Sequence, residues 1–301
     1  MVTGAVSADD GMPPLSGVLQ SRLAEVVDAR LDAGGPVLEP EQVHVAVIDI
    51  DSPGGARAAE YYGLVPVYPA SVIKMFYMGF VYDLAARGEM ALNAEVNGKL
   101  YQMIHSSSNA ATAWIVDAWS GVRHDRAMSA DDYTHFAEQR NACNRWLATI
   151  GLGEVVNANQ KTWVTPIPPG EEQFLRDGAL EGPYTNRNSM TAMGAARFLQ
   201  LIAESRLVDA ASSAAMRELM ARDVRSQPYL ARRIAGGAPA GAVVFGKTGT
   251  TSRTFHDAAV VTLANGRRYA IAVLITGRGS KGSVIRDVTA GVLDAFANVE
   301  E

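Results

Sequence analysis

The stretch Pro69-Ala70-Ser71-Val72-Ile73-Lys74-Met75-Phe76-Tyr77-Met78-Gly79-Phe80-Val81 decides how this chain is expected to fold. Proline often opens a helix and glycine often follows its last turn, so Pro69 and Gly88 predict a helix over residues 71–86. Apolar side chains lie nearly all round this helix, and such a helix is normally buried at the centre of a large core. Lys74 stands in the first turn and is therefore expected to be at least half-buried.

A buried lysine tends to be neutral. Holding Lys74 neutral at pH 7 means lowering its pKa by about 3 units, at a cost of roughly 4 kcal/mol. Chains keep such a lysine for chemistry more often than for packing. Ser71 lies three residues earlier on the same helix face, so the pair is a candidate nucleophile with its base. The spacing alone arises by chance about once in a chain of this length.

On both sides of the central helix the hydrophobic pattern predicts strands near the chain ends and helices between them. We expect strands over residues 43–50, 62–68, 242–245, 258–263 and 269–276. We expect the other helices over residues 18–31, 100–104, 110–119, 131–150, 191–204, 210–222 and 283–298.

This order of elements predicts an α+β fold, an α/β sandwich with an inserted all-α lobe. The terminal strands would form one antiparallel sheet of about five strands, flanked by the N- and C-terminal helices. The α/β subdomain would comprise residues 16–68 plus 240–301 and the all-α subdomain residues 69–239, in one catalytic unit. Residues 157–188, rich in Pro, Gly and Asn, predict a long surface loop, and long loops tend to be functional.

The composition favours a folded protein with a small-molecule substrate. Among the 301 residues 48% are hydrophobic, and the net charge is −5. The absence of a polybasic stretch argues against nucleic-acid partners, and the apolar runs are too short for membrane spans. Cys143 is the single cysteine, so no disulfide is expected within the chain. No histidines have metal-ligand spacing, so we expect no bound metal. We also expect no cofactor and a monomeric protein.

Residues 1–15 lack the basic start and apolar stretch of a signal peptide. The sequence as it stands predicts a cytoplasmic protein. If a leader has been removed, a periplasmic or secreted location is expected instead.

Two later motifs complete a pattern that starts at Ser71. Ser107-Ser108-Asn109 stands at the start of a predicted helix, and Lys247-Thr248-Gly249-Thr250 stands at the end of a predicted strand. The order Ser-x-x-Lys, Ser-x-Asn, Lys-Thr-Gly resembles that of class A β-lactamases and penicillin-binding proteins. The likeness in the order of elements covers most of the chain, and it implies a β-lactamase/transpeptidase-like fold.

The resemblance implies roles in acyl transfer. Ser71 would attack a carbonyl carbon while neutral Lys74 takes its proton. Ser107, assisted by Lys247, would relay a proton to the leaving nitrogen or oxygen. The backbone amides of Ser71 and Thr250 would form the oxyanion hole, in which each donor is worth about 10²–10³ in rate.

The resemblance also implies how substrate is held. Asn109 would hydrogen-bond the side-chain amide of the substrate. The segment Thr248-Gly249-Thr250 would bind a substrate carboxylate together with Lys247. The arginine that usually assists is missing from the next strand, and Arg253 is a candidate replacement.

Release of the product requires a base for water, and the resemblance points to Glu172 in the long loop. Glu171 is an alternative, and two solvated loop carboxylates are equally consistent with the sequence. Only 36 residues separate Ser71 from Ser107, which is short for a class A enzyme and predicts an open cleft.

The predicted function is a serine hydrolase that opens the β-lactam amide of penicillins or cephalosporins. An intracellular esterase or amidase, or a D,D-peptidase-like protein, is the alternative on the same scaffold. Residues 241–248 match a phosphate-binding loop, but their strand-like composition disfavours nucleotide binding. His256-Asp257 suggests a catalytic triad, which the lack of any G-x-S-x-G motif disfavours.

Overall fold

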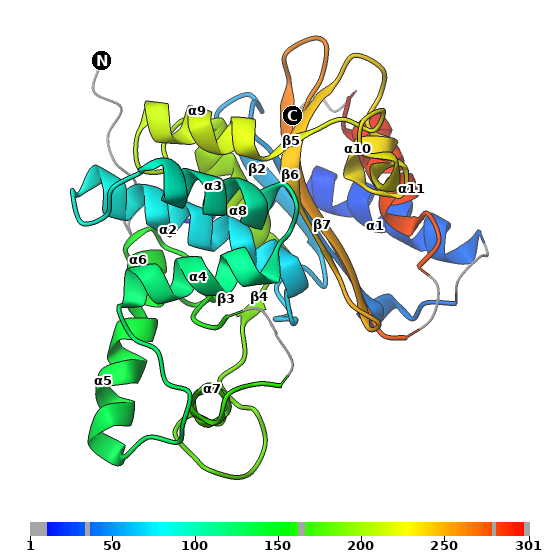
Figure 1. Cartoon of the computed structure of the whole chain (residues 1–301). Helices are drawn as coiled ribbons and strands as arrows, with labels where there is room; N and C mark the ends of the chain where they lie inside the picture. The colour runs from blue at the N-terminus through cyan, green and yellow to red at the C-terminus, as the bar shows by residue number, and fades with distance from the viewer. Residues whose placement is uncertain (1–10, 34–36, 162–165, 279–280, 298–301) are drawn as a thin grey trace.

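A six-stranded antiparallel sheet forms the centre of the computed structural model, which describes residues 11–33, 37–161, 166–278 and 281–297 (Figure 1). The strand order is β2-β1-β8-β7-β6-β5, so strands from both ends of the chain pair directly. The predicted antiparallel sheet is confirmed, with one short edge strand more than expected. The strands are β1 (Val43–Asp49), β2 (Arg57–Tyr61), β5 (Ala221–Arg222), β6 (Val243–Thr250), β7 (Thr254–Thr262) and β8 (Arg268–Thr276).

Successive side chains of a strand point to opposite faces of the sheet, and apolar side chains on both faces form two cores, one on each face. In β8, Ile271 and Val273 belong to the core that includes α1 (Gly17–Asp32) and α11 (Val284–Ala297). Ala272, between them, belongs to the core on the opposite face. That second core is covered by the helices α2 (Lys74–Ala86), α3 (Ala94–Ile104), α4 (Asn109–Ser120), α6 (Ala142–Thr149), α8 (Ala192–Ala203) and α9 (Ala210–Leu219).

The central helix is buried as predicted, but its first turn is tighter than an α-helix. Residues Ala70–Ile73 form a 3₁₀ turn, and α2 begins at Lys74. All residues of α2 from Lys74 to Tyr82 are buried. The sheet and the surrounding helices therefore hold the Ser71–Lys74 segment rigidly.

Several predicted elements are wrong in their bounds; the helix predicted over residues 100–104, for example, spans Ala94–Ile104. The strand expected over residues 62–68 lies earlier, at Arg57–Tyr61, because Tyr62 adopts a left-handed φ of +47° that ends the strand. The helix expected over residues 131–150 is two helices, α5 (Ala130–Arg140) and α6, which meet at Asn141. The Asn141 amide donates to the carbonyl of Ala137, a local side-chain bond that competes with helix continuation.

The predicted loop over residues 157–188 contains a helix, α7 (Pro169–Leu175), and four of its residues, 162–165, lie outside the described residues. The strands β3 (Val156–Asn157) and β4 (Ser189–Met190) pair at its two ends. The helices α5 and α7 project together from the body of the molecule (Figure 1). The division into subdomains remains a prediction.

The remaining elements join these layers: the short helix α10 (Ile234–Gly237) and the 3₁₀ turns Pro40–Gln42 and Pro228–Arg232. The helix predicted over residues 210–222 ends at Leu219, because Ala221–Arg222 pairs with β6 as a strand. No helix among the described residues is long and apolar enough to cross a membrane.

The phosphate-binding match over residues 241–248 fails on structural grounds. Residues 243–248 lie in β6, in register with β7, rather than in a loop before a helix. A Cβ on Gly246 would lie 2.2 Å from the carbonyl oxygen of Ala258, so this glycine serves strand packing. The nucleotide-binding interpretation is therefore abandoned.

Candidate active site

Lys74 is fully buried and is bonded only to neutral oxygens. Its Nζ donates to the carbonyl oxygen of Ser107 at 2.6 Å and to Oδ1 of Asn109 at 2.8 Å. The hydroxyl oxygen of Ser107 lies 3.4 Å away. Burial lowers the pKa of Lys74 to about 8. Among the described residues no carboxylate pairs with this lysine, so its neutral form is accessible near neutral pH.

Lys247 approaches the same serine from β6. Its Nζ lies 3.0 Å from the Ser107 hydroxyl oxygen and 3.0 Å from the carbonyl oxygen of Thr248. Burial lowers the pKa of Lys247 well below the usual range, and the positive charges of Arg222 and Lys74 lower it further. The Ser107 hydroxyl thus lies between two buried lysines, an arrangement suited to moving a proton.

Two residues of the site hold left-handed backbone conformations without being glycine. Ala70, directly before Ser71, has φ +48°, and Ser107 itself has φ +55°. Such conformations cost on the order of 1–3 kcal/mol each and persist only where the surroundings impose them. Both occur where the chain turns into a helix that carries a site residue.

Gly249 allows β6 to run against the turn that carries Ser71. A Cβ at Gly249 would lie 2.7 Å from the carbonyl oxygen of Pro69 and 3.1 Å from the amide nitrogen of Ser71. Any other residue would push the strand away from the nucleophile. The glycine of the Lys-Thr-Gly motif is therefore required by close backbone approach.

Four of the predicted residues line one cavity of about 550 Å³: Ser71, Ser107, Thr248 and Thr250. Lys74, Asn109 and Lys247 are linked to it through their contacts at Ser107. The structure therefore brings the three sequence motifs together. His105 caps the C-terminus of α3 and also lines this cavity.

Arg233 is a site residue that the sequence did not reveal. Its guanidinium donates to the Thr250 hydroxyl at 2.7 Å and to the carbonyl oxygen of His256 at 2.8 Å. It also stacks on Phe255, 3.5 Å from the ring centroid. Burial lowers its pKa to about 10, so the group is still a cation at neutral pH. Arg253, the expected replacement, is exposed in the β6–β7 turn and lines a different cavity.

His256 and Asp257 do not form a triad with Ser71. The Nδ1 atom of His256 accepts from the amide of Ile275 at 3.1 Å, so Nε2 carries the proton and donates to the carbonyl oxygen of Tyr68 at 3.0 Å. Burial lowers the His256 pKa to about 4, which keeps the ring neutral. The Asp257 carboxylate accepts from the amide of Ile234 instead. His256 thus bonds to the neighbouring strand β8, and Asp257 bonds to the start of α10.

The structure does not bring Glu172 to the Ser71 cavity. Its partly exposed carboxylate accepts from the Tyr184 hydroxyl at 2.8 Å and from Arg176 at 3.3 Å. The hydrogen bond from Tyr184 is the main reason that the pKa of Glu172 is lowered. The geometry lends no support to Glu172 as the deacylating base, and that role stays a prediction.

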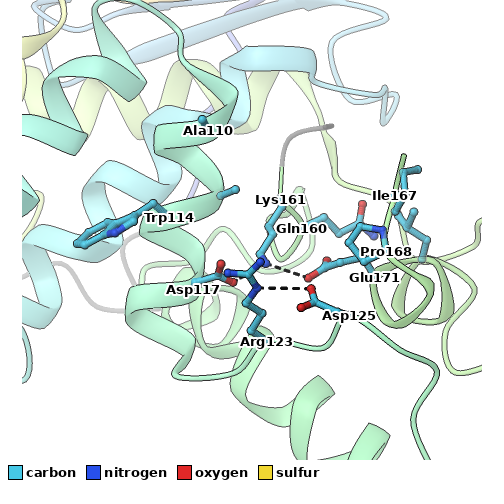
Figure 2. Close-up of a pocket in the computed structure, with 12 residues that line it drawn as sticks. Ala110, Trp114, Asp117, Arg123, Asp125, Gln160, Lys161, Ile167, Pro168 and Glu171 are labelled. Atoms are coloured by element: carbon cyan, nitrogen blue, oxygen red, sulfur yellow. Dashed lines mark hydrogen bonds and ion pairs between the residues drawn. The ribbon is translucent and has the colours of Figure 1, made fainter. Parts of the chain in front are cut away.

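Glu171 points into a second cavity, of about 330 Å³, between α4 and α7 (Figure 2). Its carboxylate binds Arg140 at 2.7 Å and Lys161 at 3.3 Å, and Lys161 reaches Asp117 at 2.5 Å. Burial raises the pKa of Glu171, but the charges and hydrogen bonds of Arg140 and Lys161 outweigh it and leave the pKa below its usual value. The described residues that line this cavity are all different from those around Ser71.

Metal chemistry has no support from the side-chain arrangement. In the part of the chain that the structure describes, no group of three or more His, Cys, Asp or Glu residues could hold an ion. Cys143 is fully buried, and burial raises the pKa of its thiol well above the usual value.

The sequence matches the model of the β-lactamase enzyme family known as Beta-lactamase2 over residues 95–296. The chain belongs to this family. A β-lactamase-type hydrolase, with a small-molecule substrate, is what this family and the fold support. No curated protein matches the sequence significantly.

Solved structures show the same fold at low identity. A β-lactamase from Sphaerobacter thermophilus is 20% identical, with a TM-score of 0.64, over 93% of this chain and 99% of that one. A class A β-lactamase from Bacteroides cellulosilyticus is 17% identical over 93% and 99% of the two chains, with a TM-score of 0.64. PBP-A is 18% identical over 96% and 99%, with a TM-score of 0.63. The β-lactamase/transpeptidase-like fold is thereby confirmed.

Proposed function

We propose that this family member opens the cyclic amide of β-lactams by forming an acyl-enzyme at Ser71. The observation that carries the proposal is the Ser107 hydroxyl, held between Nζ of Lys247 and Nζ of Lys74 beside the cavity that Ser71 lines. A nucleophile, a lysine with lowered pKa and a proton-relaying hydroxyl are the groups that acyl transfer requires.

In the attack step, the Ser71 oxygen bonds to the carbonyl carbon and its proton passes to neutral Lys74. The lowered pKa of Lys74, about 8, matches a base that works near neutral pH. The negative oxygen would be bound by the amides of Ser71 and Thr250. The Ser71 amide lies in the first helical turn, where N–H groups lack helical acceptors and the helix dipole favours negative charge.

In the next step, the carbon–nitrogen bond breaks and the leaving nitrogen takes the proton of the Ser107 hydroxyl. Protonated Lys74 then returns a proton to the Ser107 oxygen over 3.4 Å, while Lys247 donates a hydrogen bond to the same oxygen at 3.0 Å. Every proton taken from Ser71 is thereby delivered to the leaving nitrogen.

A substrate carboxylate would be held by Thr248 and Thr250, with positive charge from Lys247 and Arg233. Arg233 is already bonded to the Thr250 hydroxyl, so it fixes that side chain and adds charge behind it. Burial lowers the pKa of Lys247 in the free protein, and the negative charge of a bound carboxylate would raise that pKa again. We therefore expect carboxylate binding to be coupled to proton uptake.

We propose that the acyl-enzyme is released slowly. The described residues around Ser71 include no carboxylate that could activate water, so Lys74 would serve as the base in both steps. Slow release would give the behaviour of a penicillin-binding or D,D-peptidase-like protein, whereas rapid release would make the protein a β-lactamase in the full sense.

Intact-mass measurement with benzylpenicillin and with cephalothin tests the proposal. On the wild-type protein we expect an adduct of the mass of benzylpenicillin, and with cephalothin an adduct of the mass of the drug or of the drug less acetic acid. We expect neither adduct on Ser71→Ala. Absence of both adduct and hydrolysis with the two drugs rejects β-lactams as substrates. Adducts that persist on Ser71→Ala reject Ser71 as the nucleophile.

An esterase or amidase is the second candidate, and the position of Glu172, which is bonded to Tyr184 and does not line the cavity at Ser71, favours it. Turnover of p-nitrophenyl acetate that is lost in Ser71→Ala, with both β-lactams left intact, would identify that activity. Turnover that survives in Ser71→Ala would reject it at this site.

A further inference from the structure

The cavity at Ser71 continues into a second one. Another cavity, of about 580 Å³, shares His105, Ser226 and Gln227 with it. We call this continuation the distal groove, defined by Tyr82, Tyr101, His105, Glu218, Arg222 and Gln227. It runs between α3 and α9, which are in contact in the structure.

The distal groove starts on the leaving-group side of the site. His105 and Ser106, which immediately precede Ser107, line the shared part of the cavity. Ser107 is the residue that would protonate the leaving atom. A substituent on that atom would therefore pass His105 and enter the distal groove.

The groove is open because the chain between α2 and α3 is short. Only residues 87–93 connect the two helices. Tyr101 on α3 is 48% exposed, and its ring stacks on that of His105 with 4.8 Å between centroids and 10° between planes. The result is a flat aromatic wall that faces solvent.

The charged and aromatic groups of the groove favour a cation. Within the described residues, the exposed Glu218 carboxylate has no ion-pair partner, and its negative charge acts on Tyr82 in the wall of the groove. The Arg222 guanidinium is turned to the carbonyl oxygen of Gly246 and the Tyr229 hydroxyl. A negative charge without an ion-pair partner thus lies beside an aromatic wall, which also attracts cations.

We infer that the distal groove binds a cationic, amine- or ammonium-bearing arm on the leaving-group side of the substrate. The inference rests on the proposed acyl transfer at Ser71. In an ester or linear amide, the arm departs as an alcohol or amine that takes its proton from Ser107. In a β-lactam, the arm is the substituent of the ring fused to the lactam. It is attached while Ser71 attacks, and in cephaloridine or cephalothin it can leave as pyridine or acetate once the lactam amide has opened.

Two matched pairs of compounds test the groove. Cephaloridine and cephalothin carry the same acyl side chain but differ in a pyridinium against a neutral acetoxy group. Phenylacetylcholine and 3,3-dimethylbutyl phenylacetate differ in a quaternary nitrogen against carbon. We expect kcat/KM to favour the cationic member of each pair by about tenfold, from one weak ion pair and one cation–π contact.

The variant Glu218→Gln should lower this preference several-fold, and Tyr101→Leu should lower it independently. Glu154→Gln is the matched control, because Glu154 is an exposed glutamate far from the lining of either cavity. Equal kcat/KM within each pair for the wild type overturns the inference. A preference that falls equally in Glu154→Gln also overturns it, since net charge alone would then explain it.

Binding to Ser71→Ala separates this inference from the proposed chemistry. Calorimetry with cephaloridine and cephalothin measures the groove without any acyl transfer. If the wild type neither reacts with nor hydrolyses any of the four compounds, the proposed function fails. The inference about the groove would still be supported if Ser71→Ala bound cephaloridine more tightly than cephalothin and the double variant Ser71→Ala, Glu218→Gln did not. Equal binding of both drugs to Ser71→Ala would overturn the inference.

Discussion

Two regions of the molecule bury cations to the same depth, and their partners differ. Lys74 and Lys247, at the Ser71 site, are 0% and 1% exposed and are bonded to hydroxyl, carbonyl and amide oxygens. Arg140, beneath α7, is 0% exposed and is bonded to the carboxylate of Glu171. Burial is therefore shared by both regions, whereas within the described residues a directly bonded carboxylate is present only in the second.

This difference determines what each region can do. A buried ammonium without a carboxylate is poorly solvated, so its pKa falls and it becomes a usable base. A buried guanidinium paired with a carboxylate stays charged, and breaking the pair is strongly destabilising. We infer that the Ser71 region is built for proton transfer and the Glu171 region for holding α7 against α5.

The largest effect is expected from Lys74→Met, which keeps the apolar stem and removes the base. The rate of acylation by benzylpenicillin should fall by about 10²–10⁴-fold, the usual contribution of a general base. Rapid-mixing mass spectrometry of the adduct measures it. Lys99→Met, on α3 outside the Ser71 cavity, is the control, and a similar loss in both variants would contradict the assignment of Lys74.

Arg140→Met should affect stability rather than chemistry. It leaves the Glu171 carboxylate buried with a weaker set of partners, so the free energy of unfolding should fall by about 3 kcal/mol or more. Urea titration measures this loss. Adding Glu171→Leu should restore part of it, because the uncompensated charge is then removed. A stability unchanged in Arg140→Met would show that the ion pair does not hold α7.

The pH dependence of acylation should follow the Lys74 amine. With a pKa of about 8, the neutral fraction rises about tenfold per pH unit below that value and levels off above it. The second-order rate constant of acylation, measured at benzylpenicillin concentrations far below saturation, should show the same profile, because it reports the pKa of the free protein. Lys74→Arg keeps the cation and should lose the rising limb; a profile that is flat from pH 6 to 9 in the wild type would argue against lysine as the base.

The smallest effect concerns stability in acid. The pKa of Glu171 is lowered from 4.5 in the folded protein, so the folded state binds fewer protons there than the unfolded state. The stabilisation is present above about pH 4.5 and is lost as the pH falls through the lower folded value. Glu171→Gln should therefore differ from the wild type most at pH 6–7 and least near pH 3. Urea titrations that give one constant difference across this range would contradict it.

The motifs and the fold class could be predicted because they depend on local pattern. Apolar residues around α2 predicted its burial, and alternation in the last strands predicted the sheet. The boundaries were missed where one residue decides the geometry: the positive φ of Tyr62 and the Asn141 side chain that ends α5.

Arg233 could not be predicted. It reaches Thr250 across 17 residues only because β6 and the turn before α10 are packed together. The placement of Glu171 and Glu172 also escaped prediction, since adjacent side chains on α7 face different surroundings. The Glu171 carboxylate is buried and accepts a hydrogen bond from Arg140. The Glu172 carboxylate is partly exposed and accepts one from Tyr184.

The sequence by itself determined the central apolar helix, the three motifs and their order, because these features depend only on residue types and their local spacing. Only the tertiary structure decided which buried cations have counter-charges. The lowered pKa values of Lys74 and Lys247 depend on contacts between residues far apart in sequence, at Ser107 and Asn109. Folding removes water from these two amines. Among the described residues, it brings no carboxylate into contact with Lys74.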